Sequence, residues 1–211
     1  MVSAVSSGTD VALQRLVDRL EERAGRLGVL THRVATLDEV AVLAAELVQD
    51  GGPAAFAPHA GAGWCAVIAP TLDASHPTLR RQMSALGVRL GAIDVDDPAS
   101  ASVGVAVGIS EALYGISETG TLIVADDLGD RLVRMLAPKH ILVLDIRHML
   151  ASLDEAGDRL RDLTAAGPEQ PGRYVSFITG PSRTADIEMS LTVGAHGPAE
   201  LHIAVLGAAR A

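Results

Sequence analysis

Short stretches made almost entirely of apolar or small residues constrain the fold of this chain more than any other feature. They recur along the sequence and alternate with segments whose apolar residues are spaced as on one face of a helix. Strands that are apolar at every position are typical of a parallel sheet buried on both faces. The expected strands are Cys65–Ala69, Val103–Val107, Leu122–Ala125, Ile141–Leu144, Val175–Thr179 and Leu201–Leu206. This alternation predicts an α/β fold with a largely parallel sheet and helices on both faces.

Helical segments separate these strands, and several carry residues that begin or end helices. Thr36 to Glu39 forms a capping-box pattern, and Pro77 and Gly87 stand at the two ends of another segment. The expected helices are Asp10–Leu27, Thr36–Leu47, Pro77–Leu86, Arg131–Leu136, His148–Leu163 and a segment that begins at Ser182. No repeat or linker divides the sequence, so we predict one domain over residues 1–211, with a helical part at about 9–50 and a motif-bearing part at about 102–206.

Composition excludes several classes of function. With 26 acidic and 17 basic residues and a formal charge of −9, the surface would repel a nucleic-acid backbone. The single cysteine, Cys65, excludes an internal disulfide and leaves this chain without the thiolates that an iron–sulfur cluster needs. The histidines lack the spacing of metal ligands, so no metal site is predicted. Because no apolar run is long enough to span a bilayer and no signal sequence is visible, we expect a cytoplasmic protein.

The turns next to the expected strands are the candidate sites, because ligands of open α/β sheets bind at the carboxyl ends of strands. The first such turn is Ser117–Thr121. Thr119 and Thr121 offer hydroxyl groups, and Gly120 permits a positive φ or the close approach of a ligand. Glu118 adds a carboxylate that can transfer a proton. The alternative is a tight hairpin turn whose threonines bond to local backbone.

The second candidate begins at Gly180, where a strand is expected to lead into a helix. The free amides and the positive dipole end of such a helix attract anions. Ser182 and Thr184 offer hydroxyl groups there, and Arg183 can hold a carboxylate or phosphate through two hydrogen bonds. The alternative is an ordinary helix start, in which Ser182 or Thr184 caps the first turn and Asp186 satisfies the dipole.

The third candidate is the segment Gly194–Pro198, just before the last expected strand. His196 can carry a proton, and Gly197 lets a ligand approach the backbone. The alternative is a histidine that is structural or simply exposed.

Taken together, these segments resemble the LUD-domain family, and within it the LutC-like lactate utilisation proteins. The matching segments are Ser117–Val124, the stretch from Arg131 to Pro138-Lys139-His140-Ile141, Thr179–Glu188 and Gly194–Pro198. They cover roughly residues 102–206 in the family's order. The family usually has alanine and valine where this chain has Ser117 and Ala195, which are mild departures.

The resemblance implies a Rossmann-like α/β domain, similar to the fold of sugar-phosphate isomerases and CoA transferases. It also implies a part in oxidising L-lactate to pyruvate together with iron–sulfur partner proteins. Iron–sulfur clusters are then expected only in those partners, and no cofactor is expected in this chain.

The leading hypothesis is therefore a subunit that binds a small carboxylate or phosphate between the turn at Glu118–Thr121 and the segment at Ser182–Arg183. Glu118 and His196 would handle protons there. One alternative is a non-catalytic scaffold subunit. Another is an independent enzyme like the isomerases or CoA transferases, in which Glu118 would be the nucleophile.

Overall fold

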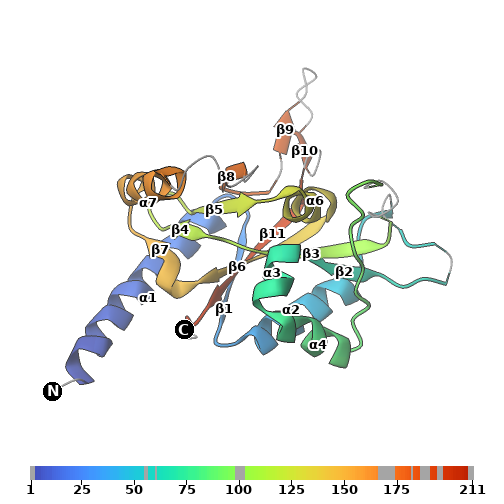
Figure 1. Cartoon of the computed structure of the whole chain (residues 1–211), viewed down its shortest axis with the longest axis horizontal. Helices are drawn as coiled ribbons and strands as arrows, with labels where there is room; N and C mark the ends of the chain where they lie inside the picture. The colour runs from blue at the N-terminus through green and yellow to red at the C-terminus, as the bar shows by residue number, and fades with distance from the viewer. Residues whose placement is uncertain are drawn as a thin grey trace.

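A five-stranded parallel sheet forms the centre of the molecule (Figure 1). The computed structural model describes residues 3–54, 57–59, 61–97, 103–165, 174–181, 183–185, 191–193 and 197–208. In their order across the sheet, the strands are β1 (Leu30–Val34), β11 (Glu200–Leu206), β6 (Lys139–Asp145), β3 (Val105–Glu111) and β2 (Cys65–Ile68). Every neighbouring pair in this sheet is parallel. The predicted α/β fold with a parallel central sheet is confirmed.

Helices cover both faces of the sheet, which explains why its strands are apolar throughout. The helices are α1 (Ser3–Gly25), α2 (Leu37–Gln49), α3 (Pro70–Ser75), α4 (Pro77–Ala85), α6 (Leu128–Leu136) and α7 (Leu153–Ala165). In β6, Ile141 and Val143 pack in a core with residues of α2, α3, α4 and α6. Leu142 and Leu144, which point the other way, pack in a second core with residues of α1. Successive residues of one strand thus serve opposite faces.

A second, four-stranded sheet shares a core with α1. Its strands, in order, are β7 (Met149–Leu150), β4 (Tyr114–Ile116), β5 (Thr121–Asp126) and β8 (Tyr174–Ile178). β5 pairs antiparallel with both β4 and β8. Leu122 and Val124 of β5 share the core that contains Leu142 and Leu144. The sequence predicts β5 and β8 but not β4 and β7.

The helix expected to begin at His148 begins at Leu153 instead. The intervening residues include β7, which pairs in parallel with β4. Ser152 Oγ accepts a hydrogen bond from the Glu155 amide at 3.3 Å, and Glu155 Oε2 accepts one from the Ala151 amide at 2.7 Å. These two hydrogen bonds resemble a capping box and set the start of α7.

The helix expected at Ser182 is wrong. Arg183–Ala185 forms β9, which pairs antiparallel with β10 (Leu191–Val193) in a hairpin that projects near β11 (Figure 1). Thr184 and Thr192 are paired in the backbone register of this hairpin. Threonine is a residue type that favours extended backbone. A strand has neither the free terminal amides nor the dipole of a helix, so that explanation of an anion site no longer holds for β9.

Candidate functional site

Three segments that are far apart in the sequence meet at one cavity, which we call the motif pocket. Its volume is about 470 Å³. Arg131, Arg134 and Met135 of α6, residues 176–180 at the end of β8, and Gly197, Pro198 and Leu201 at the start of β11 line it. Two of the expected ligand-binding residues, Gly180 and Gly197, are therefore in its wall.

The motif pocket lies at the amino ends of β6 and β11, not at the carboxyl ends where we expected a site. Leu201 stands at the beginning of β11, and Met135 lies in the last turn of the helix that leads into β6. Gly197 also precedes its strand. Thr179 and Gly180 do follow a strand, but that strand, β8, belongs to the second sheet.

Two arginines bring positive charge to the motif pocket, and their surroundings differ. Arg134 is buried and forms two hydrogen bonds with the carboxylate of Asp126, which is buried as well. Burial lowers the pKa of Arg134 to about 10, so the group is still charged at neutral pH. The positive charge of Arg134 is therefore neutralised by Asp126.

Arg131 is the arginine with capacity for a ligand. It is half-buried, and its guanidinium carbon lies 4.8 Å from the centre of the Tyr174 ring. Within the part of the chain that the structure describes, no carboxylate pairs with Arg131. Stacking on an aromatic ring leaves the N–H groups at the edge of the guanidinium free to bind a carboxylate or phosphate.

Three threonine hydroxyls connect the turn before β5 to the motif pocket. Thr119 Oγ1 donates to Thr121 Oγ1 at 2.8 Å, and Thr121 Oγ1 lies 3.0 Å from Thr179 Oγ1. Thr179 lines the motif pocket, whereas Thr119 and Thr121 do not. The turn does join an antiparallel hairpin, but these hydroxyls bond to one another rather than to local backbone.

Both the backbone conformation at position 120 and the residues packed against it require glycine. Its φ is +71°, in the left-handed region. A Cβ atom at this position would lie 2.7 Å from the Ala24 nitrogen and 2.9 Å from Arg23 Cβ. The turn therefore packs directly on the last turn of α1.

We expect Gly120→Ala to lower the free energy of unfolding by about 3 kcal/mol, because it combines backbone strain with a clash against helix backbone. Urea denaturation followed by the fluorescence of Trp64, the only tryptophan, measures this. Gly25→Ala is the matched control, since a Cβ atom there meets nothing within 4 Å. Equal denaturation midpoints for the two variants would contradict the argument.

Glu118 has a structural contact in this fold. It is exposed, and its Oε2 atom accepts a hydrogen bond from the Leu153 amide at 3.1 Å. Leu153 is the first residue of α7, so the carboxylate satisfies a free amide at the positive end of the helix dipole. Glu118 does not line the motif pocket. This contact supports a helix cap rather than a nucleophile.

Several expected site residues are not placed by the structure. Ser182, Asp186 and His196 lie outside the described residues. Arg183 and Thr184 lie in β9, of which only the backbone is described.

Sequence reasoning did not select the arginines of α6 or Thr179 as site residues. Arg131 and Arg134 are three positions apart and therefore fall on the same face of a helix, which is a readable signal. The pairing of Arg134 with Asp126, which closes β5, depends on the tertiary fold and leaves no comparable signal.

The described residues contain no group of three or more histidine, cysteine, aspartate or glutamate side chains placed to bind a metal ion. Cys65 is buried, and burial raises the pKa of its thiol, as is typical of an inert core cysteine. Across the same residues, no helix combines the length and the apolar character needed to cross a membrane.

Comparison with known proteins gives a consistent match. The LUD domain model matches residues 17–206 of this chain. Lactate utilization protein C of Bacillus subtilis (strain 168) is 36% identical over 94 residues, which are 44% of this chain and 38% of that protein. Lactate utilization protein C of Shouchella clausii (strain KSM-K16) is 37% identical over 93 residues, 44% of this chain and 40% of that protein. The aligned region thus spans about two fifths of each relative.

A solved structure shares the fold. The crystal structure of a DUF162 family protein from Deinococcus radiodurans superposes with a TM-score of 0.60 and covers 92% of this chain and 98% of its own. Its sequence identity is 14%, so the likeness concerns the fold alone.

Proposed function

Because this chain belongs to the LUD domain family, we propose that it takes part in lactate utilisation and that the motif pocket binds a small carboxylate. The names of the relatives support a role in lactate utilisation, and the motif pocket is the proposed binding site for the carboxylate. L-Lactate and pyruvate are the carboxylates that this proposal names. A sugar phosphate, which presents a similar anionic group, is the competing ligand.

The observation that carries the proposal is the meeting of Arg131 with Thr179, Gly180 and Gly197 around one cavity. Arg131 would hold the carboxylate, and the Thr179 hydroxyl would bond to the hydroxyl or keto oxygen next to it. The two glycines have no side chains, so a ligand can reach their backbone amides. His196, next to Gly197 in the chain, remains the proposed proton carrier, while Glu118 holds α7.

The electrons would leave this chain through a partner. Oxidation of L-lactate to pyruvate releases a pair of electrons and a pair of protons, so an acceptor is required. The single buried thiol of Cys65 cannot hold an iron–sulfur cluster. We therefore propose iron–sulfur partner proteins as the acceptor, in a reducing cytoplasm where a lone thiol stays free.

Titration calorimetry with L-lactate, pyruvate and glucose 6-phosphate tests the site. We expect saturable binding of L-lactate or pyruvate, and a loss of affinity of about tenfold or more in Arg131→Gln, because a hydrogen-bonded charge is removed. Arg159→Gln, at an exposed arginine of α7, is the matched control. Arg183→Ala tests whether β9 contributes to the same site.

Two outcomes would overturn this proposal. One is the absence of binding by the wild-type protein for all these ligands. The other is an equal loss of affinity in Arg131→Gln and Arg159→Gln, which would reflect net charge rather than a site. Binding of glucose 6-phosphate alone would move the function from lactate to a phosphate ligand.

A further inference from the structure

A second cavity, which we call the carboxyl-end hollow, lies at the opposite end of the central sheet from the motif pocket. Its volume is about 270 Å³. Thr71 and Ser75 of α3, Glu111 at the end of β3, and His148 line it, over a floor that includes Ala112 and Ala125. Because α3 follows β2, the hollow sits at the carboxyl ends of β2 and β3, where ligands of parallel sheets bind.

Glu111 brings a negative charge to the carboxyl-end hollow. It is the last residue of β3 and is half-buried. No hydrogen bond or ion pair engages its side chain within the described part of the molecule. A carboxylate that has lost part of its hydration without gaining a partner favours a cation beside it.

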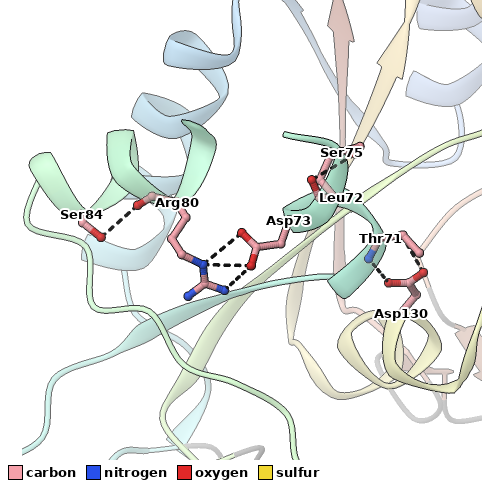
Figure 2. A network of polar contacts seen from close by, with 7 residues as sticks. All are labelled: Thr71, Leu72, Asp73, Ser75, Arg80, Ser84 and Asp130. Carbon is pink, nitrogen blue, oxygen red and sulfur yellow. Dashed lines mark hydrogen bonds and ion pairs between the residues drawn. The ribbon is translucent and has the colours of Figure 1, made fainter. Parts of the chain in front are cut away.

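The two hydroxyl groups that α3 contributes to the hollow have already donated their protons, so their oxygens can only accept a further hydrogen bond. Thr71 Oγ1 donates to Asp130 Oδ2 at 2.6 Å, and Ser75 Oγ donates to the Leu72 carbonyl at 3.2 Å (Figure 2). Asp130 is buried and adds a second negative charge behind Thr71. The polar wall formed by α3 and Glu111 therefore consists of hydrogen-bond acceptors.

Arginines close to α3 in the fold do not neutralise this wall. Arg80 of α4 is bound to the Asp73 carboxylate by three hydrogen bonds of 2.7–3.0 Å (Figure 2). Arg147, next to His148, is bound to Asp145. Both guanidinium groups have carboxylate partners of their own.

We propose that the carboxyl-end hollow binds a small organic ammonium ion, with Glu111 as its anchor. Three N–H donors of an ammonium group match the Glu111 carboxylate and the oxygens of Thr71 and Ser75. The apolar floor at Ala112 and Ala125 suits a short alkyl chain. A metal ion fits less well, because the described residues offer no trio of metal-binding side chains here. This site is separate from the motif pocket and does not depend on the proposed lactate function.

Titration of the wild-type protein with n-propylammonium chloride, followed by amide NMR spectra, tests the proposal. We expect saturable shifts at residues of the hollow such as Ser75 and Ala112. Propan-1-ol, the uncharged analogue, and magnesium chloride should produce no saturable shift at these residues. Glu111→Gln should weaken n-propylammonium binding by about tenfold or more, whereas Glu22→Gln, at an exposed carboxylate of α1, should not.

The wild-type titrations decide the proposal even if Glu111→Gln does not fold. Absence of saturable shifts with n-propylammonium would overturn the site, and equal shifts with propan-1-ol would overturn the role of charge. Saturable binding of Mg²⁺ at the same residues would overturn the ammonium ligand in favour of a metal. A folded Glu111→Gln that binds as tightly as the wild type would overturn the role of Glu111.

Discussion

Replacing Arg134 by methionine is expected to lower the free energy of unfolding by about 3–5 kcal/mol. The Arg134 guanidinium forms two hydrogen bonds with Asp126, whose side chain is 4% exposed. Arg134→Met therefore leaves a buried carboxylate without a partner, and its desolvation is no longer offset. Urea denaturation followed by Trp64 fluorescence measures the loss.

A double variant separates the ion pair from simple packing. Arg134→Met combined with Asp126→Leu removes both charges, and a buried pair replaced by apolar residues is often neutral or even stabilising. We therefore expect the double variant to recover most of the stability that the single variant loses. If the double variant is as unstable as Arg134→Met alone, the loss comes from altered packing and the charge argument is wrong.

The central sheet could be predicted because its inner strands are buried on both faces. β6 and β11 lie inside the sheet, and residues 141–144 and 203–206 within them are all apolar. β1 gave no such signal, since it is an edge strand that contains His32 and Arg33, both half-buried. The composition of an edge strand reflects its partial exposure, and its pairing with β11 depends on residues at the other end of the chain.

The second sheet was hidden by the shortness of its strands. β4 has three residues and β7 has two, so neither shows a period. The start of α7 was nevertheless readable, because Ser152 and Glu155 have the spacing of a capping box. At Ser182, the pattern Gly-Pro-Ser was equally compatible with a strand, and only the pairing of β9 with β10 decides between them.

The candidate site was predictable as a set of segments but not as a geometry. Motif spacing identified Gly180 and Gly197, which line one cavity. The end of the sheet at which they meet depends on whether each motif precedes or follows its strand in the sequence. It also depends on where the second sheet packs. The roles of Arg131 and Glu118 follow from tertiary contacts with Tyr174 and Leu153, which local sequence does not encode.

Stability is expected to fall as the pH drops from 6.5 to 5, because the fold lowers the pKa of three histidines. His32 Nε2 lies 3.0 Å from His202 Nδ1, and His140 Nε2 lies 2.8 Å from Ser110 Oγ. Burial lowers the pKa of all three imidazoles, that of His140 to about 3. Glu46 and Glu200 oppose the shifts of His32 and His202, whereas Arg134 adds to that of His140.

The sign follows from the unfolded chain, in which histidine titrates near pH 6.5. Below that pH the unfolded state takes up protons that the folded state does not. The free energy of unfolding therefore has its full value above about pH 6.5 and decreases as the pH falls. Each histidine that stays neutral in the folded state lowers the free energy of unfolding by about 1.4 kcal/mol per pH unit below about 6.5. For His140 alone, this lowers the free energy of unfolding by about 2 kcal/mol between pH 6.5 and 5. Asp145, whose pKa is lowered by Arg147, titrates below this window.

Urea denaturation at closely spaced pH values, with two variants, tests this origin. His202→Gln removes one titrating group while its amide can still hydrogen-bond to His32, so the pH dependence should become shallower by up to about 1.4 kcal/mol per unit. His59→Gln, at an exposed histidine, should leave the profile unchanged. A wild-type profile that is flat between pH 6.5 and 5, or a His202→Gln profile with the wild-type slope, would show that these imidazoles do not couple folding to protonation.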